Sequence, residues 1–405
     1  MKIGLERLSS LKKLKVLDLS GNHDIDNDII PSLKTLTSLK ILDLSDTSLN
    51  GNFPISEFAA LKNLEVLDLS YCYFNGTFEI QGFETGSILT KLKILNLGHN
   101  RFDESVITSL SILSSLTNLD LSNNPMSGPF PAQACKSLSR LKRLENINLS
   151  YHNFNKSIIS CLSTLPSLKI LDLSYSTSLG SSFPFQEFHD LPDLEVLLLR
   201  DNDFSGTLPI EAFASFRHLE VLDLNGNNFV GSIPSAIHAL SSLRALSLAN
   251  NYHGSLPDHG FSELKNLHEL DLSHNRLHGT LPQCVFSFSS FSNHSKLEVI
   301  LFSSDSEEFV VETEEPTDWI PMFQLQILEL SNCNMNMPKG QVVPGFLLHQ
   351  HKLRELHLPH NSLEGHFPSW FFKNNTNLDV LNLRNNSFGS MPLYRNANIW
   401  KSHNR

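Results

Sequence analysis

A single pattern of leucines recurs from one end of the sequence to the other, and it restricts the possible folds more than any other feature. The spacing L-x-x-L-x-x-L-x-L-x-x-N-x-L begins in residues 11–22 and returns almost unchanged in residues 61–72. The first leucine or isoleucine of each L-x-L pair gives fifteen reference positions: Leu17, Leu42, Leu67, Leu95, Leu119, Ile147, Leu171, Leu197, Leu222, Leu246, Leu270, Ile300, Leu328, Leu356 and Leu381. They lie about 26 residues apart, so we expect the chain to grow by stacking similar units instead of closing around one core.

Each repeat predicts one short β-strand. In residues 16–20 two leucines alternate with Val16, Asp18 and Ser20, and alternate side chains of a strand face opposite sides of its sheet. The leucines should stack in the interior, and the other side chains should lie on the inner face of a parallel sheet. The predicted fold is an α/β leucine-rich-repeat solenoid, a right-handed superhelix with a parallel inner β-sheet and irregular or short-helical outer arcs. We expect a single leucine-rich-repeat domain of fifteen repeats over residues 1–405.

A polar position lies five residues after each reference position, where the chain leaves the strand and turns inward. An asparagine amide supplies both donors and acceptors to the backbone there, and stacked copies can link one repeat to the next. The predicted structural ladder consists of Asn22, Cys72, Asn100, Asn124, Asn202, Asn227, Asn251, Asn275, Cys333, Asn361 and Asn386.

The outer arcs follow a second motif, L-x-G-x-[IFL]-P, as in residues 204–209 and 229–234. Glycine permits the turn, and proline ends the backbone pairing of the strand. The residues that follow, such as 235–240, suit a short helix on the convex side. One arc departs from this rule: residues 303–321 form an acidic outer-arc insertion. We expect a solvated bulge there, with a contact for a basic partner as the alternative.

Charge and hydropathy argue against two classes of partner. The formal net charge is −11, and the 31 lysines and arginines are scattered, which argues against nucleic acid. No run of ~18 apolar residues is present, so we expect no direct membrane insertion by this chain. The start of the sequence lacks the apolar core of a secretory signal peptide. Six N-x-S/T sequons nevertheless favour a secreted origin, and the predicted glycosylation sites are Asn75, Asn148, Asn155, Asn293, Asn374 and Asn385.

The five cysteines do not form an obvious framework of disulfides. Cys72 and Cys333 belong to the ladder. Cys161 and Cys284 lie five repeats apart, roughly 24 Å at strand spacing, which is too far for a disulfide. Cys135 and Cys161, in neighbouring arcs, are the only conceivable pair, and we expect buried free thiols there too.

No phosphate-binding glycine loop, zinc-ligand pair or nucleophile elbow is present in the sequence. We therefore expect no catalytic residue, no metal site and no cofactor. The densest group among the 18 histidines is His349, His351, His357 and His360. Repeat geometry spreads these along an edge, whereas metal ligands must converge, so we expect solvated histidines.

The predicted ligand-binding residues lie on the inner face, where a scaffold of this shape normally works. Generic repeats carry Asp and Ser there, as in Asp68 and Ser70, but later repeats depart from this rule. An exposed leucine beside an arginine suits a partner contact, with repeat drift without function as the alternative. The predicted set is Leu198, Arg200, Asp223, Asn225, Ser247, Glu355, His357 and Arg384.

The L-x-G-x-[IFL]-P segments resemble the plant-specific class of leucine-rich repeats. Further stretches at 291–299, 313–325, 367–370 and 374–378 are similar to the extracellular part of plant receptor-like proteins. The resemblance implies a peptide, protein or microbial-pattern ligand, a partner receptor kinase, and a place on the extracellular face of the plasma membrane. The sequence shows no signal peptide, cysteine-paired caps, membrane helix or cytoplasmic domain, so we expect a segment of such an ectodomain.

The function that follows is a non-catalytic scaffold for ligand or protein binding, which the resemblance places in defence or developmental signalling. One alternative is a secreted inhibitor of cell-wall-degrading enzymes, similar to polygalacturonase inhibitors, which shares the repeat but is usually shorter, more regular and capped. A carbohydrate-active enzyme is a further alternative. It would need a convergent pair of carboxylates that the repeat register does not supply.

Overall fold

The computed structural model describes residues 5–76, 88–210, 216–257, 260–277, 285–306, 308–317, 319–337 and 342–390. The chain divides into two compact units, Met1–Phe229 and Val230–Arg405. Each unit is described by itself below. The sequence predicted a single domain over the whole chain, and that expectation stays a prediction.

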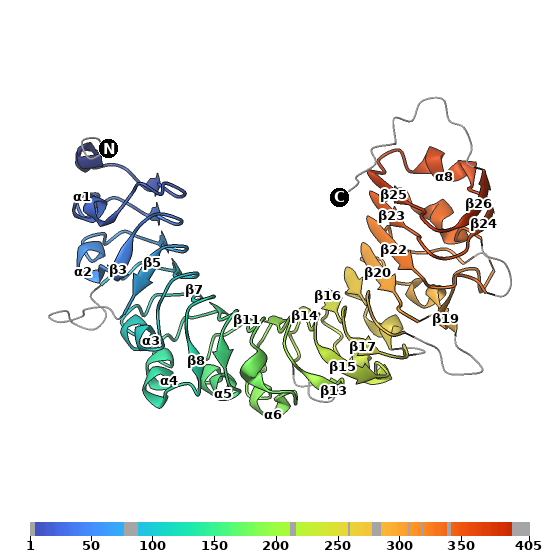
Figure 1. Ribbon diagram of the computed structural model, residues 1–405, viewed down its shortest axis with the longest axis horizontal. Coiled ribbons are helices and arrows are strands. Elements are labelled where there is room, and N and C mark those ends of the chain that lie inside the picture. The colour runs from blue at the N-terminus through green and yellow to red at the C-terminus, as the bar shows by residue number, and fades with distance from the viewer. Residues whose placement is uncertain are drawn as a thin grey trace. The chain divides into compact units, whose positions relative to one another are not determined.

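Fifteen short parallel strands, one for each repeat, form the main sheet structure, and this confirms the predicted fold class. The nine strands in the first unit are β1 (Val16–Asp18), β2 (Ile41–Asp43), β4 (Val66–Asp68), β6 (Ile94–Asn96), β7 (Asn118–Asp120), β9 (Asn146–Asn148), β11 (Ile170–Asp172), β12 (Val196–Leu198) and β14 (Val221–Asp223). The six in the second unit are β16 (Ala245–Ser247), β18 (Glu269–Asp271), β20 (Val299–Ser303), β22 (Ile327–Ser331), β23 (Glu355–His357) and β25 (Val380–Asn382). Figure 1 shows the strands of each unit along one side of that unit and the helices along the other.

The register of the sheet stacks the reference leucines on one another. Leu42 pairs with Leu17 on one side and with Leu67 on the other. Leu67 and Leu222 are fully buried, whereas Asp68 is only partly buried. Alternation along a strand explains this difference, because neighbouring side chains point to opposite faces. Each leucine buried in this way stabilises the fold by about 2 kcal/mol relative to an exposed one.

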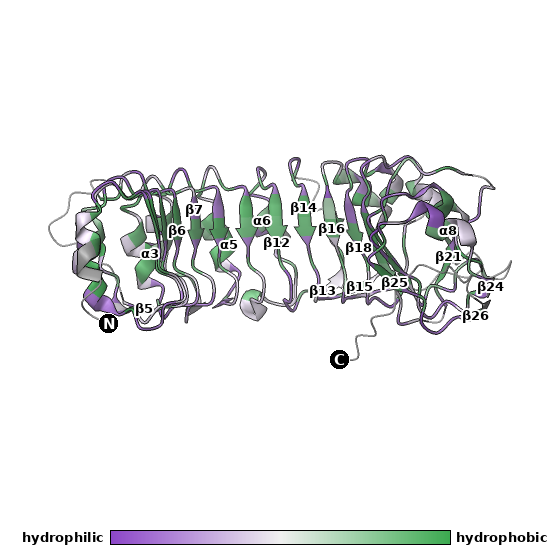
Figure 2. Ribbon diagram, turned by 90° about the horizontal axis from the view of Figure 1, so that it is seen from above, coloured by the Kyte–Doolittle hydropathy of each residue, from purple (hydrophilic) through white to green (hydrophobic). Residues whose placement is uncertain are grey.

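Phenylalanines fill the wider part of the interior, behind the strands. Several occupy the position seven residues after a reference leucine, including Phe74, Phe102 and Phe154, and all three are completely buried. Neighbouring rings are in contact, as between Phe204 and Phe229, whose centroids are 6.4 Å apart. In Figure 2, strands such as β12 and β14 are coloured as apolar, and the loops that flank them are largely polar.

The outer arcs contain short helices, many of which begin directly after a proline. Pro54, Pro131 and Pro234 each occupy the capping position of the helix that follows, where the missing N–H costs nothing. In the first unit the helices are η1 (Leu5–Ser10), η2 (Asn27–Ile29), α1 (Ile30–Leu33), α2 (Ile55–Phe58), α3 (Ser105–Leu110), α4 (Ala132–Leu138), α5 (Ser157–Leu162), η3 (Thr177–Leu179) and α6 (Phe185–Phe188). In the second they are η4 (Ser235–Ala239), η5 (Phe261–Glu263), η6 (Phe288–Phe291), η7 (Gly345–His349) and α8 (Ser369–Asn374).

A second set of short strands follows the turn at the end of the main strands. They pair in parallel with their counterparts in the next repeat, for example β3 with β5 and β19 with β21. Their bounds are β3 (Asn50–Asn52), β5 (Tyr73–Asn75), β8 (Ser127–Gly128), β10 (Asn153–Phe154), β13 (Ser205–Thr207), β15 (Asn228–Gly231), β17 (Tyr252–His253), β19 (Val285–Ser287), β21 (Val310–Glu312), β24 (Glu364–His366) and β26 (Ser387–Ser390).

The acidic insertion at 303–321 is built into the second unit more closely than a solvated bulge would be. Strand β20 runs through Ser303, and β21 contributes three residues to a parallel pair with β19. Trp319 donates a hydrogen bond from Nε1 to the carbonyl oxygen of Thr313 at 2.8 Å. Its ring packs against Phe346 with centroids 5.4 Å apart. Glu307 and Asp318 lie outside the described residues.

Two cysteines that we expected to be free thiols form a disulfide. Cys135 on α4 and Cys161 on α5 are bonded, with their Cα atoms 5.3 Å apart. The expectation failed because both side chains lie on helices at the same place in consecutive arcs, and this separation suits a disulfide. Cys72 and Cys333 are free and buried, as the ladder hypothesis expects. Cys284 lies outside the described residues.

Candidate functional site

The asparagines five residues after the reference positions bond the backbone of two repeats at once. The Nδ2 atom of Asn124 donates to the carbonyl oxygens of Leu121 in its own repeat and Leu97 in the preceding one, at 2.8 and 3.0 Å. Its Oδ1 accepts from the backbone N–H of Phe102 at 2.9 Å. The same three-way arrangement recurs at Asn100, Asn202, Asn227, Asn275 and Asn386. In the first repeat Asn22 is exposed and donates to Leu19 and Ser20 of its own repeat.

His152 replaces asparagine at this position in the sixth repeat. Its side chain is 1% exposed, and burial lowers the pKa of its imidazole to about 4. The Nδ1 atom lies 2.9 Å from the carbonyl oxygen of Ser150. Within the described part of the chain, no hydrogen-bond partner reaches Nε2. The imidazole is therefore held neutral inside the fold.

Four of the predicted ligand-binding residues lie together on the inner face of the first unit. Leu198 on β12 pairs in register with Asp172 on one side and Asp223 on the other. Arg200 is exposed two residues beyond Leu198, and its Nε donates to Asp201 at 2.8 Å. The backbone N–H of Asn225 donates to Asp223 at 2.9 Å. Leu198 thus separates two carboxylates, and Arg200 stands between Ser174 and Asn225 in the neighbouring column.

The other four predicted residues lie in the second unit and fall into two places. Ser247 is on β16, which three strands separate from β23 in the sheet order. Glu355 and His357 are both on β23, and their side chains approach to 3.3 Å. Arg384 follows β25, the neighbour of β23, and is exposed. The second unit therefore brings Glu355, His357 and Arg384 together but does not bring Ser247 to them.

The structure also reveals a row of side chains, four of them rings, that our sequence reasoning missed. Four residues after the reference positions of the third to seventh repeats stand Tyr71, His99, Asn123, Tyr151 and Tyr175, which we call the edge row. Tyr71 stacks on His99 with ring centroids 3.9 Å apart, and Tyr151 stacks on Tyr175 at 4.2 Å. The signal was present in the repeat alignment, because aromatic residues recur in one column beside the ladder.

Each aromatic pair of the edge row also has a polar contact. The side-chain amide of Asn123 lies 2.7 Å from Nδ1 of His99. A hydrogen bond to Asp201 raises the pKa of the Tyr175 hydroxyl to about 12. Tyr175 therefore stays protonated at physiological pH and donates to a carboxylate.

The six sequons differ in their surroundings. Asn75, Asn293 and Asn385 are exposed, whereas Asn155 and Asn374 are partly buried. Asn148 lies on strand β9, and its Nδ2 donates to Asp120 at 2.9 Å. A glycan needs this same nitrogen. The Nδ2 atoms of Asn374 and Asn385 are engaged as well, by the carbonyl oxygen of Leu348 at 3.0 Å and by Nδ1 of His360 at 3.2 Å.

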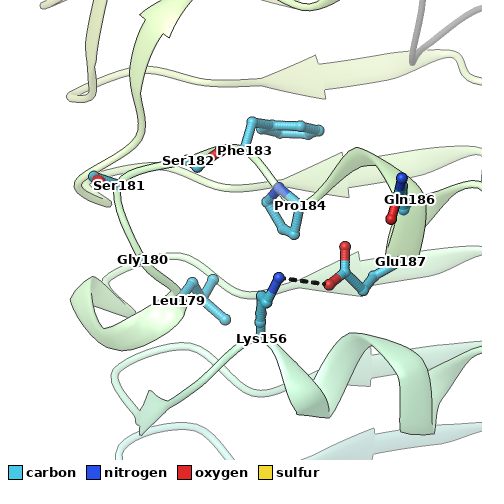
Figure 3. A pocket seen from close by; sticks show the side chains of 9 residues that line it. All are labelled: Lys156, Leu179, Gly180, Ser181, Ser182, Phe183, Pro184, Gln186 and Glu187. Carbon is cyan, nitrogen blue, oxygen red and sulfur yellow. Dashed lines mark ion pairs between the residues drawn. The ribbon is translucent and has the colours of Figure 1, made fainter.

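A surface pocket of about 460 Å³ lies on the outer side of the first unit. Figure 3 shows Lys156 and Glu187 facing each other across it, 3.0 Å apart. The two charges compensate each other, so the pocket does not draw in an ionic ligand. It is lined by Lys156, Leu179, Gly180, Ser181, Ser182, Phe183, Pro184, Gln186 and Glu187.

The described residues contain neither a metal-binding cluster nor a membrane-spanning helix. No group of three or more His, Cys, Asp or Glu side chains in these residues is placed to hold a metal ion. No helix in the same part of the chain has the length and apolar character needed to cross a membrane.

Comparison with known families agrees with the repeat geometry. A model described as a leucine-rich repeat region matches residues 2–209. Leucine-rich-repeat models also match residues 205–252, 241–291 and 352–374. These matches extend from the first repeat to the fourteenth.

Plant receptor-like proteins are similar to this chain in sequence. Receptor-like protein 13 of Arabidopsis thaliana is 37% identical over 78% of this chain and 34% of its own length. Receptor-like protein 14 is 42% identical over 76% of this chain and 36% of its own length. The chain thus spans about a third of the length of the curated relatives it matches.

Solved structures share the fold over nearly the whole chain. A TDR receptor matches with a TM-score of 0.67 and 27% identity, over 93% of this chain and 64% of that receptor. The Arabidopsis receptor kinase HAESA matches with a TM-score of 0.64 and 23% identity, over 94% of this chain and 63% of its own. The chain therefore belongs to the leucine-rich-repeat family, and it is a relative of the plant receptor-like proteins.

Proposed function

We propose that this chain is a non-catalytic scaffold that binds a peptide or protein ligand on the inner face of its main strands. It acts as an ectodomain segment of a plant receptor-like protein in defence or developmental signalling. One observation carries the proposal. Half-buried Leu198 lies between Asp172 and Asp223 in the register of the sheet, and exposed Arg200 follows it two residues later, on the same side of the chain. Arginine is enriched among the residues that dominate protein interfaces, and the partly exposed leucine adds apolar surface beside it.

The disulfide supports a place outside the cell. Cys135 and Cys161 are bonded, and such bonds persist in oxidising surroundings, whereas the cytosol keeps thiols reduced. The exposed sequons Asn75, Asn293 and Asn385 are compatible with passage through the secretory pathway. These features support an extracellular scaffold whose signal a partner receptor kinase would pass on.

The fold itself is used for peptide recognition elsewhere. HAESA was solved in complex with the peptide hormone IDA and the co-receptor SERK1. At 23% identity this likeness concerns the fold, and a shared fold does not fix a ligand. The proposal for this chain therefore depends on its own inner-face residues.

A peptide selection tests the proposal. A phage-displayed library of random peptides is panned against the immobilised 405-residue chain, and the selected peptides are measured by calorimetry. Arg200→Glu should weaken their binding by about 2 kcal/mol or more, because it reverses a charge at a central contact.

Arg140→Glu is the matched control, because Arg140 is exposed in the outer arc that follows α4. It should change the affinity by less than about 0.5 kcal/mol. Equal losses in both variants, or peptides that ignore both substitutions, would count against an inner-face site at Leu198 and Arg200.

A further inference from the structure

The rings of the edge row stand where the backbone conformation is unfavourable for them. Tyr71, His99, Tyr151 and Tyr175 have φ angles of 53°, 55°, 60° and 57°. This left-handed region suits glycine and asparagine, and it costs other residues about 1 kcal/mol each. The same column carries Gly21 and Gly226, which adopt it with φ of 68°. The backbone of this column therefore does not require aromatic residues.

The repeats hold the edge row rigidly. The backbone N–H of Tyr71 donates to the carbonyl oxygen of Gly98 at 3.0 Å, and that of Tyr151 donates to Ser174 at 2.9 Å. Despite these bonds, Tyr71 and Tyr151 are 55% and 50% exposed. Stacking returns about 1 kcal/mol for each pair, which offsets only part of the backbone cost of its two residues. The rings of Tyr71 and Tyr151 thus add little to the stability of the fold and remain exposed to solvent.

The surface around the edge row is acidic. Asp68, Asp120 and Asp172 lie on the adjoining strands, three residues before Tyr71, Asn123 and Tyr175. In these five repeats, the two inner-face positions beside the row contain no lysine or arginine. Each of the three carboxylates accepts a hydrogen bond from the backbone N–H of the residue two positions later. These bonds fix the carboxylates in place. The Oδ2 atoms of Asp68 and Asp120 also accept from the side-chain amides of Asn96 and Asn148, at 2.9 Å each, and each of these two Oδ2 atoms keeps capacity for a further donor.

The molecule already shows which group such rings attract. The guanidinium of Arg101 lies over the ring of Tyr73, 4.9 Å from its centroid, and that of Arg276 lies over Tyr252 at 4.6 Å. A planar guanidinium stacks on an aromatic face and still donates to carboxylates in its own plane. Tyr151 turns one face to Tyr175, and the member of the edge row in the preceding repeat is the smaller Asn123.

We propose that the edge row binds the arginine side chains of an extended basic peptide segment, with one guanidinium on Tyr71 and another on Tyr151. The two tyrosines are three repeats apart, about 14 Å at strand spacing. An extended chain covers this distance in about four residues. The structure thus assigns a partner with two arginines four positions apart. This inference goes beyond the proposed function, since it needs no ligand at Leu198 and Arg200.

The test uses fluorescent, end-blocked peptides of alanine and serine that carry two arginines four positions apart. Matched peptides carry lysine, or neutral and planar citrulline, at the same positions. Binding to the full chain is followed by fluorescence anisotropy at low and high salt. The arginine peptide should bind about tenfold more tightly than the citrulline peptide, and salt should weaken it. Equal binding of the arginine and citrulline peptides would overturn the proposal.

Substitutions locate the binding surface. Tyr151→Asn and Tyr71→Asn remove the rings and keep a residue that accepts the left-handed backbone, as Asn123 does with φ of 50°. Each substitution should weaken the binding of the arginine peptide about tenfold. Tyr73→Asn is the matched control, because Tyr73 is 50% exposed on β5 and lies outside the edge row. It should change the affinity less than about twofold.

Further outcomes separate this inference from its rivals. Arg200→Glu should not weaken binding of the arginine peptide. The edge-row proposal can therefore be tested even if no ligand binds at Leu198 and Arg200. An effect of Tyr73→Asn as large as that of Tyr151→Asn would overturn the assignment to the edge row. Displacement of the arginine peptide by cellohexaose, lost in Tyr151→Asn, would also overturn it in favour of a carbohydrate ligand.

Discussion

The asparagine at the end of each main strand shows how much a single side chain contributes in this fold. Asn124 is buried, and its amide bonds two carbonyl oxygens and one N–H that would otherwise lie buried without partners. A buried polar group without a partner costs about 1–3 kcal/mol. At residue scale the ladder is thus a repeated solution to one problem of backbone hydrogen bonding.

We predict that Asn124→Ala lowers the free energy of unfolding by about 1–3 kcal/mol, measured by urea denaturation. Asn22→Ala is the matched control, since Asn22 is exposed and bonds only its own repeat among the described contacts. It should cost less than about 1 kcal/mol. A larger loss at Asn22 than at Asn124 would mean that the bonds between repeats do not provide the stability.

His152 makes the same position sensitive to acid. Burial lowers the pKa of His152 from 6.5 to about 4, so the folded state favours the neutral imidazole and the unfolded state binds the proton more readily. The contribution of neutral His152 to the free energy of unfolding is intact above pH 6.5, and it is lost as the pH falls from 6.5 towards 4. Between pH 7 and pH 5 the loss amounts to about 2 kcal/mol.

The variant His152→Asn removes this titration and should restore the ladder amide. We predict that its stability relative to the unmodified chain rises by about 2 kcal/mol between pH 7 and pH 5. Urea midpoints at the two pH values give this difference directly, and other titrating groups cancel in the comparison. An unchanged difference between the two proteins would show that folding does not lower the pKa of His152.

At the scale of elements, the sequence predicted the main strands well and the contacts between outer arcs poorly. A strand such as β4 follows from alternation alone, since Leu67 and Leu69 must face the interior. The pairing of Cys135 with Cys161 depends on how α4 and α5 are placed side by side, and no local pattern encodes that placement. The edge row was missed because its column varies between repeats, and only the structure shows that its rings stack on one another.

The disulfide should stabilise the neighbouring helices α4 and α5. The bond closes a loop with a sequence separation of 26 residues. Closing a loop of this size restricts the unfolded chain and contributes about 3 kcal/mol. We predict that dithiothreitol lowers the free energy of unfolding by about this amount in denaturant titrations.

A double variant, Cys135→Ser with Cys161→Ser, provides the control for this prediction. Cys72 and Cys333 are already free thiols, so the double variant should no longer respond to dithiothreitol. Sensitivity to reductant that persists in the double variant would place the effect elsewhere in the protein.

At the scale of the whole molecule, the repeats combine a nearly constant interior with a surface whose residues vary from repeat to repeat. The interior positions repeat as leucine, but the inner-face residues change from Asp68 and Ser70 in one repeat to Leu198 and Arg200 in another. The periodicity revealed which positions are displayed. It could not reveal which displayed residues meet a ligand, because that depends on the partner, and the two units keep Leu198 and Glu355 in separate bodies.

Carboxyl footprinting tests most directly the central claim that the inner face binds the ligand. A peptide selected against the chain is added, solvent-accessible carboxylates, including partly buried ones, are labelled with carbodiimide and glycine ethyl ester, and labelling is read by mass spectrometry. We predict reduced labelling at Asp172 and Asp223, which flank Leu198 on the inner face. Labelling should stay unchanged at Asp190 and Asp193, which are exposed in the outer arc after α6. Protection of Asp190 and Asp193, with Asp172 and Asp223 labelled as before, would contradict the account.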